Sequence, residues 1–385
     1  MITIRGMTWQ HERGVAPLVA AASDYNRLHP DVKMEWDARS LQDFERYPLE
    51  LLADRYDLIM IDHPHIGAAV AENLLLPLDD FIASSFLTDQ RLQSVGSSYD
   101  SYTWEGRQWA LAADAAAQIA AYRQDLLQQA GLELPRSWDD VLALAKELPE
   151  GTKIGLPLVP VHAYSSYFTL CAQIGGEAFW SRDLDVPYAV GEEALRILKN
   201  LLAVSHKQSA FVDPIGMYEL LCTTNEIAYV PLIYGYSNYA RAGFRPFQVR
   251  CANIPSANGS PNGSMIGGVG LAISSRCKHT DHAVNFLTMT VNGDYQKTSF
   301  FQNGGQPGHL KAWKDEEVNR VSNGFFLDTL ETLTLGSMRP RFKGYIEFQE
   351  RAGTDIRQFL IEGNESFGSI VHRLNQMIHR YKSTN

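Results

Sequence analysis

The chain has 385 residues, a length that exceeds one typical hydrophobic core and suits two domains. Hydrophobic residues make up 45% of the chain and charged residues 20%, which is ordinary for a globular protein. The net charge of −10 argues against a protein that neutralises nucleic-acid phosphates or lies on anionic lipid. Because the sequence has no run of about 18 apolar residues, we also expect no membrane insertion.

The N-terminal part of the chain alternates between strand and helix patterns. A short β run opens the chain at residues 2–7, and a helical pattern follows at 17–28. Residues 32–36 alternate like a second strand, and residues 57–61 form an apolar run typical of a parallel strand covered on both faces. Helical periodicity resumes at 68–73. This order predicts a doubly wound α/β lobe, and such lobes bind ligands beyond the carboxyl ends of their strands.

The remaining elements predict a second lobe and a helical C-terminal part. Two strands meet at the small residues 112–114, which is how a chain that crosses between lobes would look. Ser137 is the predicted N-cap of a helix that runs to Leu148, with Asp140 as its acidic partner. The other expected elements are strands at 109–111, 115–122, 227–233, 249–254 and 266–273, helices at 192–204 and 216–223, and a C-terminal helical region at 359–381 interrupted near 363–364.

Residues at the expected strand ends and lobe joints are candidates for a ligand site. A site for a hydroxylated ligand needs planar apolar faces together with fixed hydrogen-bond donors and acceptors. Asp62 and Asp114 suit the binding of hydroxyl groups, because a charged acceptor strengthens a hydrogen bond. Trp9 could stack on such a ligand or equally pack in the core. The candidate ligand-binding residues are Trp9, His11, Asp62, His63, His65, Asp114, Tyr234, Tyr236, Gly268, Gln306 and Arg341.

Three of these candidates, His11, His63 and His65, allow a second interpretation. His63 and His65 are two residues apart, so their side chains share one face of an extended loop. With His11 and Asp62 they could form a three-His or two-His–one-carboxylate metal site, which would suit an enzyme. The same imidazoles could instead donate hydrogen bonds to an anionic or hydroxylated ligand. We favour ligand binding and expect no metal.

Other catalytic and cofactor signatures are absent from the sequence. It contains no GxSxG, no P-loop and no HExxH. The glycines at 267, 268 and 270 are not followed by a further glycine at the spacing that a dinucleotide-binding fingerprint requires. The 4 cysteines are scattered, without CxxC or zinc-ligand spacing, and are expected to be free thiols. We therefore expect no cofactor and no catalytic residue.

Several segments carry a resemblance to a known family. Residues 123–148 contain RQDLLQQAGL, then a proline, SWDD and AKEL, and residues 266–274 read IGGVGLAIS. DLIMID at 57–62 is followed by LPLD at 76–79. In this order the segments resemble those of the family 1 extracellular solute-binding proteins, the carbohydrate-type receptors of ABC importers. Arg339-Pro340-Arg341 resembles the family's cleft-lining segment, where a guanidinium could grip a carboxylate or phosphate.

The resemblance implies a two-lobe, type II periplasmic-binding-protein-like α/β fold. Its doubly wound lobes would be joined by a hinge and followed by a helical C-terminal extension. The expected domains are residues 1–112 plus 265–312 for lobe 1, and residues 113–264 plus 313–385, with the C-terminal helices, for lobe 2.

The function that the resemblance implies is that of a substrate-binding protein of an ABC importer. Two lobes would close around a small polar solute, such as a sugar or sugar acid, and a membrane permease would be the protein partner. No catalysis and no nucleic acid are expected. The first residues lack the pattern of a signal peptide. A periplasmic or extracellular location is therefore expected if a signal was removed, and a cytoplasmic one if Met1 is the natural start. The alternative is an enzyme or cytosolic sensor on the same fold that uses His11, His63 and His65, with or without a metal.

Overall fold

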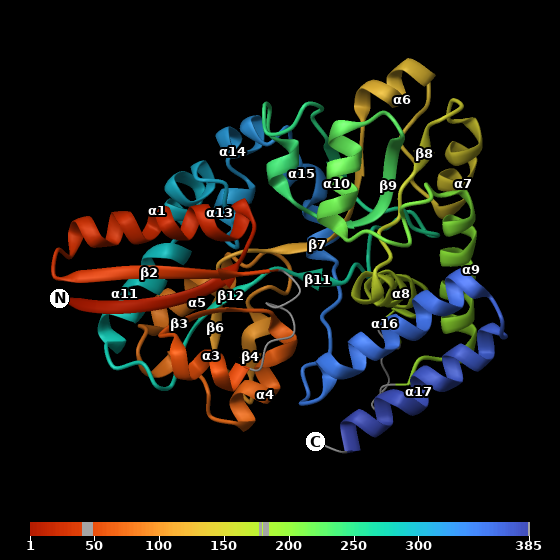
Figure 1. The fold of residues 1–385 in the computed structure, drawn as a ribbon. Helices are drawn as coiled ribbons and strands as arrows, with labels where there is room; N and C mark the ends of the chain where they lie inside the picture. The colour runs from red at the N-terminus through yellow and green to blue at the C-terminus, as the bar shows by residue number, and fades with distance from the viewer. Residues whose placement is uncertain (41–48, 177–178, 180–184, 384–385) are drawn as a thin grey trace. The chain divides into compact units, whose positions relative to one another are not determined.

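The chain divides into two compact α/β units. A computed structural model describes residues 1–40, 49–176, 179 and 185–383. Unit 1 comprises Met1–Ala116, Gly267–Asn319 and Met338–Lys343, and unit 2 comprises Ala117–Ile266, Arg320–Ser337 and Gly344–Asn385. Figure 1 shows that each unit has its own central strands flanked by helices.

The core of unit 1 is a five-stranded mixed sheet with the strand order β2-β1-β3-β12-β6. β1 pairs in parallel with β2 and β3, whereas β12 runs antiparallel to β3 and β6. β3 is buried at every position, as its continuous apolar sequence predicted. The strands of unit 1 are β1 (Ile2–Trp9), β2 (Val32–Arg39), β3 (Leu58–Ile61), β6 (Ala110–Ala112) and β12 (Gly270–Ile273), with a separate hairpin of β4 (Thr103–Trp104) and β5 (Arg107–Gln108).

Helices bury their apolar sides against this sheet. Figure 1 shows α1 beside β1 and β2, where it buries Leu18, Ala21 and Tyr25. α1 begins at Glu12, earlier than the predicted start at residue 17, because His11 caps its first turn. The helices of unit 1 are α1 (Glu12–Leu28), α3 (Leu49–Arg55), α4 (Ile66–Ala71), α5 (Ser84–Leu92), α11 (Thr280–Val291), α12 (Gly293–Tyr295), α13 (Leu310–Trp313) and most of α14 (Glu316–Val321), with short turns η1 (His63–His65), η2 (Leu78–Asp80), η3 (Asp100–Tyr102) and a π-helical turn η6 (Gln296–Phe300).

Unit 2 is also built on a mixed sheet, in the order β10-β7-β9-β8, with β11 paired to β7. β7 runs antiparallel to β9 and β10, and β8 is parallel to β9. Both sheets therefore mix strand directions, which the pattern of single strands could not reveal. The strands are β7 (Ala116–Tyr122), β8 (Lys153–Ile154), β9 (Ile227–Tyr234), β10 (Arg250–Ala252) and β11 (Ile266–Gly267).

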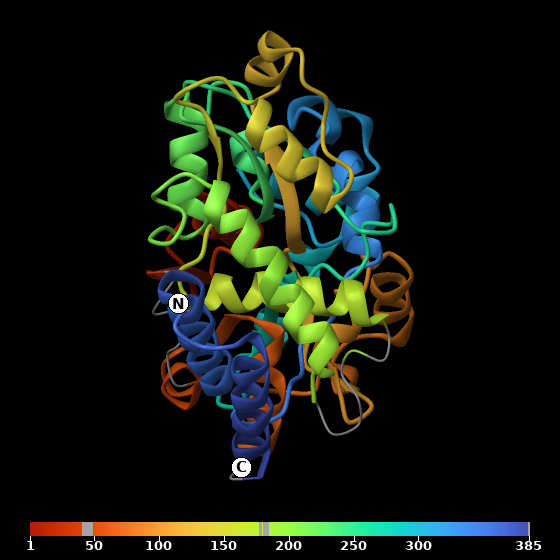
Figure 2. The ribbon, with the colours of Figure 1, turned by 90° about the vertical axis from the view of Figure 1, so that its right-hand side faces the viewer.

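The C-terminal helices of unit 2 form a hairpin. Figure 2 shows α16 and α17 side by side, and α16 also lies against α8. Gly363, in a left-handed conformation, ends α16, so the predicted interruption is confirmed. The predicted capping of α7 by Ser137 and Asp140 is also confirmed. The helices of unit 2 are α6 (Gln124–Ala130), α7 (Trp138–Glu147), α8 (Pro160–Gly175), α9 (Tyr188–Val204), α10 (Pro214–Thr223), α15 (Phe325–Thr334), α16 (Tyr345–Glu362) and α17 (Phe367–Ser383), with the short turn η5 (Ser237–Ala240).

The predicted strand at 266–273 is divided between the two sheets. β11 pairs with β7 in unit 2, and β12 pairs with β3 and β6 in unit 1. Between them, Gly268 has φ +86°, a conformation that residues with a Cβ rarely adopt. The continuous apolar pattern thus predicted strand structure correctly but concealed the point at which the chain changes sheets.

Candidate functional site

The carboxyl ends of three strands lie at one edge of the unit 1 sheet. β1 and β3 are parallel, and β6 runs in the same direction because both β3 and β6 are antiparallel to β12. Trp9 ends β1, Asp62 follows β3, and Asp114 comes shortly after β6. We call this the strand-end edge. The structure therefore places Trp9, Asp62 and Asp114 at the kind of edge where α/β sheets bind ligands.

The turn after β1 is organised by His11 and Arg13. The Nδ1 of His11 accepts a hydrogen bond of 3.0 Å from the backbone N–H of Arg13, which caps α1. The Arg13 guanidinium lies 6.0 Å from the centre of the Trp9 ring. Trp9 is only 4% exposed, and a Cβ at Gly14 would lie 2.6 Å from its ring. His11 thus has a helix-capping contact, and Trp9 is packed against its own turn.

Asp114 forms a buried ion pair with Arg13. The Nε of Arg13 donates to one oxygen of Asp114 at 2.6 Å, and Nη2 donates to the other. The side chains are 4% and 1% exposed. Burial raises the pKa of Asp114, and the Arg13 guanidinium opposes this rise. The sequence identified the carboxylate but not its partner, although Arg13 lies in the same loop as His11.

Asp62 is paired with Arg339. The Nη2 of Arg339 donates to both oxygens of Asp62, at 2.6 and 2.7 Å. Burial alone would raise the pKa of Asp62, but the Arg339 guanidinium and His63 outweigh burial and hold this pKa well below its usual range. Asp62 is therefore an ionised acceptor at the strand-end edge.

His63 is fully buried beside this pair. Its Nδ1 lies 3.4 Å from Oδ1 of Asp62, and its ring meets Tyr102 edge to face at 6.4 Å. Burial lowers the pKa of His63 to about 4, and the positive charge of Arg339 adds to this effect. His63 is therefore neutral over the physiological range. His65 lies half-buried at the start of α4.

The buried state of His63 predicts a loss of stability in acid. The unfolded histidine titrates near an ordinary pKa of about 6.5, so between about pH 6.5 and pH 4 the unfolded state binds more protons. Lowering the pH from about 6 to about 4.5 should cost about 2 kcal/mol through this residue. The variant His63→Leu should lack this loss, whereas His279→Leu at an exposed position should retain it. Urea unfolding at stepped pH measures the difference, and equal losses in wild type and His63→Leu would contradict the prediction.

Arg341 is engaged with backbone carbonyl groups of unit 1. Its Nη1 donates to the carbonyl oxygens of Asp100, Ser101 and Thr103 at 2.9, 3.0 and 2.6 Å. Its guanidinium also lies 5.3 Å from the centre of the Trp104 ring. These contacts fix one face of the guanidinium. Binding of an anionic ligand by Arg341 stays a prediction.

Gly268 and Gln306 contact the backbone that follows β6. A Cβ at Gly268 would lie 2.5 Å from the carbonyl oxygen of Asp114, so this close approach requires glycine. The Nε2 of Gln306 donates to the carbonyl oxygen of Ala115 at 2.8 Å, and Gln296 donates to that of Ala113 at 3.1 Å. Both glutamines are completely buried. Gln296, which sequence reasoning did not identify, thus supports the same segment as Gln306.

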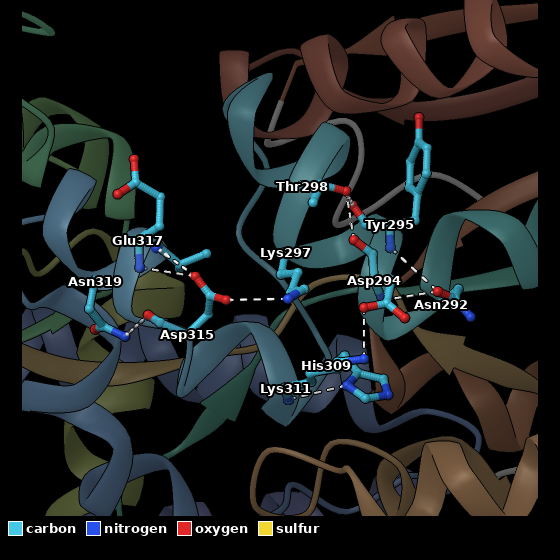
Figure 3. Close-up of polar contacts among 11 residues, drawn as sticks. Asn292, Asp294, Tyr295, Lys297, Thr298, His309, Lys311, Asp315, Glu317 and Asn319 are labelled. Atoms are coloured by element: carbon cyan, nitrogen blue, oxygen red, sulfur yellow. Dashed lines mark hydrogen bonds and ion pairs between the residues drawn. The ribbon is translucent and has the colours of Figure 1, made fainter.

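Gln296 opens the π-helical turn η6, and ion pairs surround this turn. Lys311 contacts Asp294 at 2.7 Å, and Lys297 contacts Asp315 at 3.5 Å (Figure 3). Asn292 caps α12 by accepting from the backbone N–H of Asp294 at 2.9 Å. This network ties η6 to α12, α13 and α14, and so supports the position of Gln296.

In unit 2, Tyr234 and Tyr236 have different surroundings. Tyr234 ends β9, is half-buried, and meets His162 edge to face at 5.8 Å. Tyr236 is 6% exposed and meets Tyr218 edge to face at 6.1 Å. His162 carried no recognisable sequence signal, because it lies in an apolar helical pattern with no charged residue beside it. The contact of either tyrosine with a ligand stays a prediction.

The three histidines of the alternative interpretation do not assemble a metal site. Within residues 1–40, 49–176, 179 and 185–383, no group of three or more His, Cys, Asp or Glu side chains could hold a metal ion. His11 instead caps α1, and His63 is packed beside Asp62.

All four cysteines are free, as predicted, and three of them are buried. Of the helices in the described part of the chain, none is long and apolar enough to cross a membrane.

Comparison with known proteins places this geometry in a family. The family model for bacterial extracellular solute-binding proteins matches residues 8–212. Maltose-bound MalE3 of T. maritima is 16% identical with a TM-score of 0.85, and the match covers 100% of both chains. An α-D-tagatose-bound ABC transporter solute-binding protein of Thermotoga lettingae TMO is 16% identical with a TM-score of 0.82, over 99% of both chains. An ABC transporter solute-binding protein of Agrobacterium radiobacter K84, in complex with ribitol, is 17% identical with a TM-score of 0.80, over 98% of both chains. The predicted periplasmic-binding-protein-like α/β fold is thereby confirmed.

Proposed function

This chain belongs to the bacterial extracellular solute-binding protein family, and we propose that it binds a small sugar or polyol for an ABC importer. The solved relatives named above bind maltose, α-D-tagatose and ribitol. These compounds differ in size and ring form but are all uncharged and densely hydroxylated. Their common chemistry defines the solute class that we propose for this chain.

The ion-paired carboxylate of Asp62 is the observation that best supports this class. Asp62 is ionised and partly accessible, with 18% of its side chain exposed. A carboxylate oxygen that accepts one bond from Arg339 keeps a second lone pair for a solute hydroxyl. Such a charge-assisted hydrogen bond is stronger than one between neutral groups. A strand-end edge with this acceptor suits a hydroxylated solute.

In this proposal the protein works outside the cytoplasm and passes its solute to a membrane permease, in keeping with the extracellular family. The two units are proposed to be the two predicted lobes. Solute binding would then stabilise a closed state, because that state binds the solute more tightly than the open one does. The solute would be released chemically unchanged.

A thermal-shift screen tests the proposed solute class. Maltose, D-tagatose and ribitol are added separately, with the amino acids alanine, glutamate and lysine as a comparison set. A solute at about 100 times its Kd stabilises the native state by about 2.7 kcal/mol, which raises the Tm visibly. We expect at least one sugar or polyol to raise the Tm and to be recovered unchanged. A shift only with amino acids, or consumption of the added sugar, would contradict the proposal.

A further inference from the structure

A short segment of the chain leaves unit 2, joins unit 1 and returns. Met338–Lys343 belongs to unit 1, whereas the segments on either side, Arg320–Ser337 and Gly344–Asn385, belong to unit 2. We call Met338–Lys343 the strap. It contains neither helix nor strand, so its conformation depends on what its side chains and backbone contact in unit 1.

Three cations at alternate positions attach the strap to unit 1. Arg339 pairs with Asp62, Arg341 donates to backbone carbonyl groups of residues 100–103, and Lys343 contacts Glu72 at 3.2 Å. The strap backbone also packs directly on α4, where a Cβ at Gly67 would overlap the carbonyl oxygen of Arg341. The strap is thus fixed to unit 1 at each of these points.

The three attachments differ in what they hold. Lys343 and Glu72 are exposed to 43% and 38%, so their pair is screened by solvent and holds only the end of the strap. Arg341 holds backbone groups. Arg339 alone of the three contacts a carboxylate at the strand-end edge, and its side chain is only 5% exposed. Its contact with Asp62 is therefore poorly screened and directional.

We propose that Arg339 is a positioning residue for solute binding. The strap places Arg339 at the strand-end edge, where its guanidinium keeps the Asp62 carboxylate ionised and fixed in orientation. The inference rests on the proposed function, in which Asp62 accepts hydrogen bonds from solute hydroxyls. A bond from Arg339 to each oxygen restricts rotation of the carboxylate and leaves a lone pair on each oxygen. The acceptor is thus oriented before solute arrives, which reduces the ordering cost of binding.

Among the residues that the structure describes, the other groups around Asp62 stabilise its charge less than Arg339 does. His63 lies 3.4 Å from Asp62 and is neutral at pH 7. Tyr102 is buried, its pKa is raised well above the ordinary value by burial and by Asp62, and it carries no charge. Arg341 acts on this cluster as a more distant positive charge, since its guanidinium is held at the carbonyl groups of residues 100–103. Arg339 makes the largest contribution that opposes burial at Asp62, so its removal should raise the pKa of this carboxylate.

The first test uses the ligand-free protein. The carboxyl carbon of Asp62 is followed by ¹³C NMR as a function of pH, and the Asp62→Asn variant identifies its signal. In wild type we expect a pKa below the ordinary range, and in Arg339→Met a pKa above it. The matched control Lys343→Met removes a charge from the same strap and should leave the Asp62 titration unchanged. A low pKa retained in Arg339→Met, or an equal change in Lys343→Met, would overturn the proposal. If Arg339→Met does not fold, Arg339→Gln keeps a donor without the charge and carries the same test.

The second test uses calorimetric titration with maltose, D-tagatose and ribitol between pH 4 and pH 8. For any of these probes that wild type binds, affinity should be constant with pH. In Arg339→Met it should be at least about tenfold weaker at pH 7 and fall by about tenfold per pH unit below the raised pKa of Asp62. Arg339→Lys should restore the flat pH profile. A weaker affinity with an unchanged pH profile would mean that Arg339 is merely structural. If none of the probes binds wild type, the proposed solute class fails for them, while the titration of Asp62 still decides whether Arg339 keeps this carboxylate ionised.

Discussion

Replacing Arg13 by methionine is expected to lower the free energy of unfolding by about 3–5 kcal/mol at pH 7. The variant Arg13→Met removes both donors to the Asp114 carboxylate and leaves a side chain that is 1% exposed without its counter-ion. An ionised carboxylate in such surroundings loses its hydration without compensation. Urea unfolding of the purified variant measures the loss.

The dependence of this loss on pH identifies its cause. Burial already raises the pKa of Asp114, and removal of the opposing guanidinium raises it further. Below this raised pKa the folded state binds more protons than the unfolded state, whose aspartate titrates near a pKa of about 3.9. The stability of Arg13→Met should therefore approach that of wild type as the pH falls from about 7 towards about 4.

Two further variants test whether the loss of stability in Arg13→Met comes from the unpaired Asp114 charge. Arg13→Met combined with Asp114→Leu removes the stranded charge and should recover most of the lost stability, because apolar residues can replace a buried pair. Arg196→Met breaks an exposed pair with Glu193 within one helix and should cost at most about 0.5 kcal/mol. A loss of less than about 1 kcal/mol in Arg13→Met, or one that does not change with pH, would contradict the assigned role of the pair.

The order of elements could be predicted because each depends on local patterns. The apolar run of β3, the Ser137 cap of α7 and the break between α16 and α17 are all properties of a few consecutive residues. The directions of β12 and β6 depend instead on pairings between distant segments. Those pairings leave no mark on the periodicity of either strand, so the mixed sheets could not be predicted from it.

For the same reason, the sequence pointed to the carboxylates of the candidate ion pairs but not to the pairing itself. Asp62 and Asp114 were identified because they directly follow or lie near strand ends. Their partners, Arg339 and Arg13, lie 277 and 101 residues away in sequence. An ion pair over such a separation depends on the completed fold. The charge state of each carboxylate, and with it the electrostatics of the strand-end edge, therefore became visible only in the structure.

The close packing of the strap gives the second large expected effect, which is independent of charge. Gly67 lies in α4 and is buried, and alanine there would place its Cβ against the backbone carbonyl oxygen of Arg341. Backbone atoms cannot rotate away as a flexible side chain can, so either the strap or α4 must move. Although alanine favours a helix over glycine by up to about 1 kcal/mol, we expect Gly67→Ala to be destabilising by about 3 kcal/mol.

The matched control for Gly67→Ala is Gly368→Ala in α17. There the new Cβ would meet only the end of the Glu192 side chain, at 2.8 Å, and this side chain can move aside. Gly368→Ala should therefore be neutral or slightly stabilising.

Hydrogen exchange should accelerate within residues 338–343 in Gly67→Ala and remain unchanged there in Gly368→Ala. Because Gly67→Ala leaves Arg339 and Asp62 chemically intact, a raised Asp62 pKa in this variant would show that the strap must be seated for Arg339 to act. A stable Gly67→Ala protein with normal exchange would mean that the strap can shift without cost, and that it does not fix the position of Arg339.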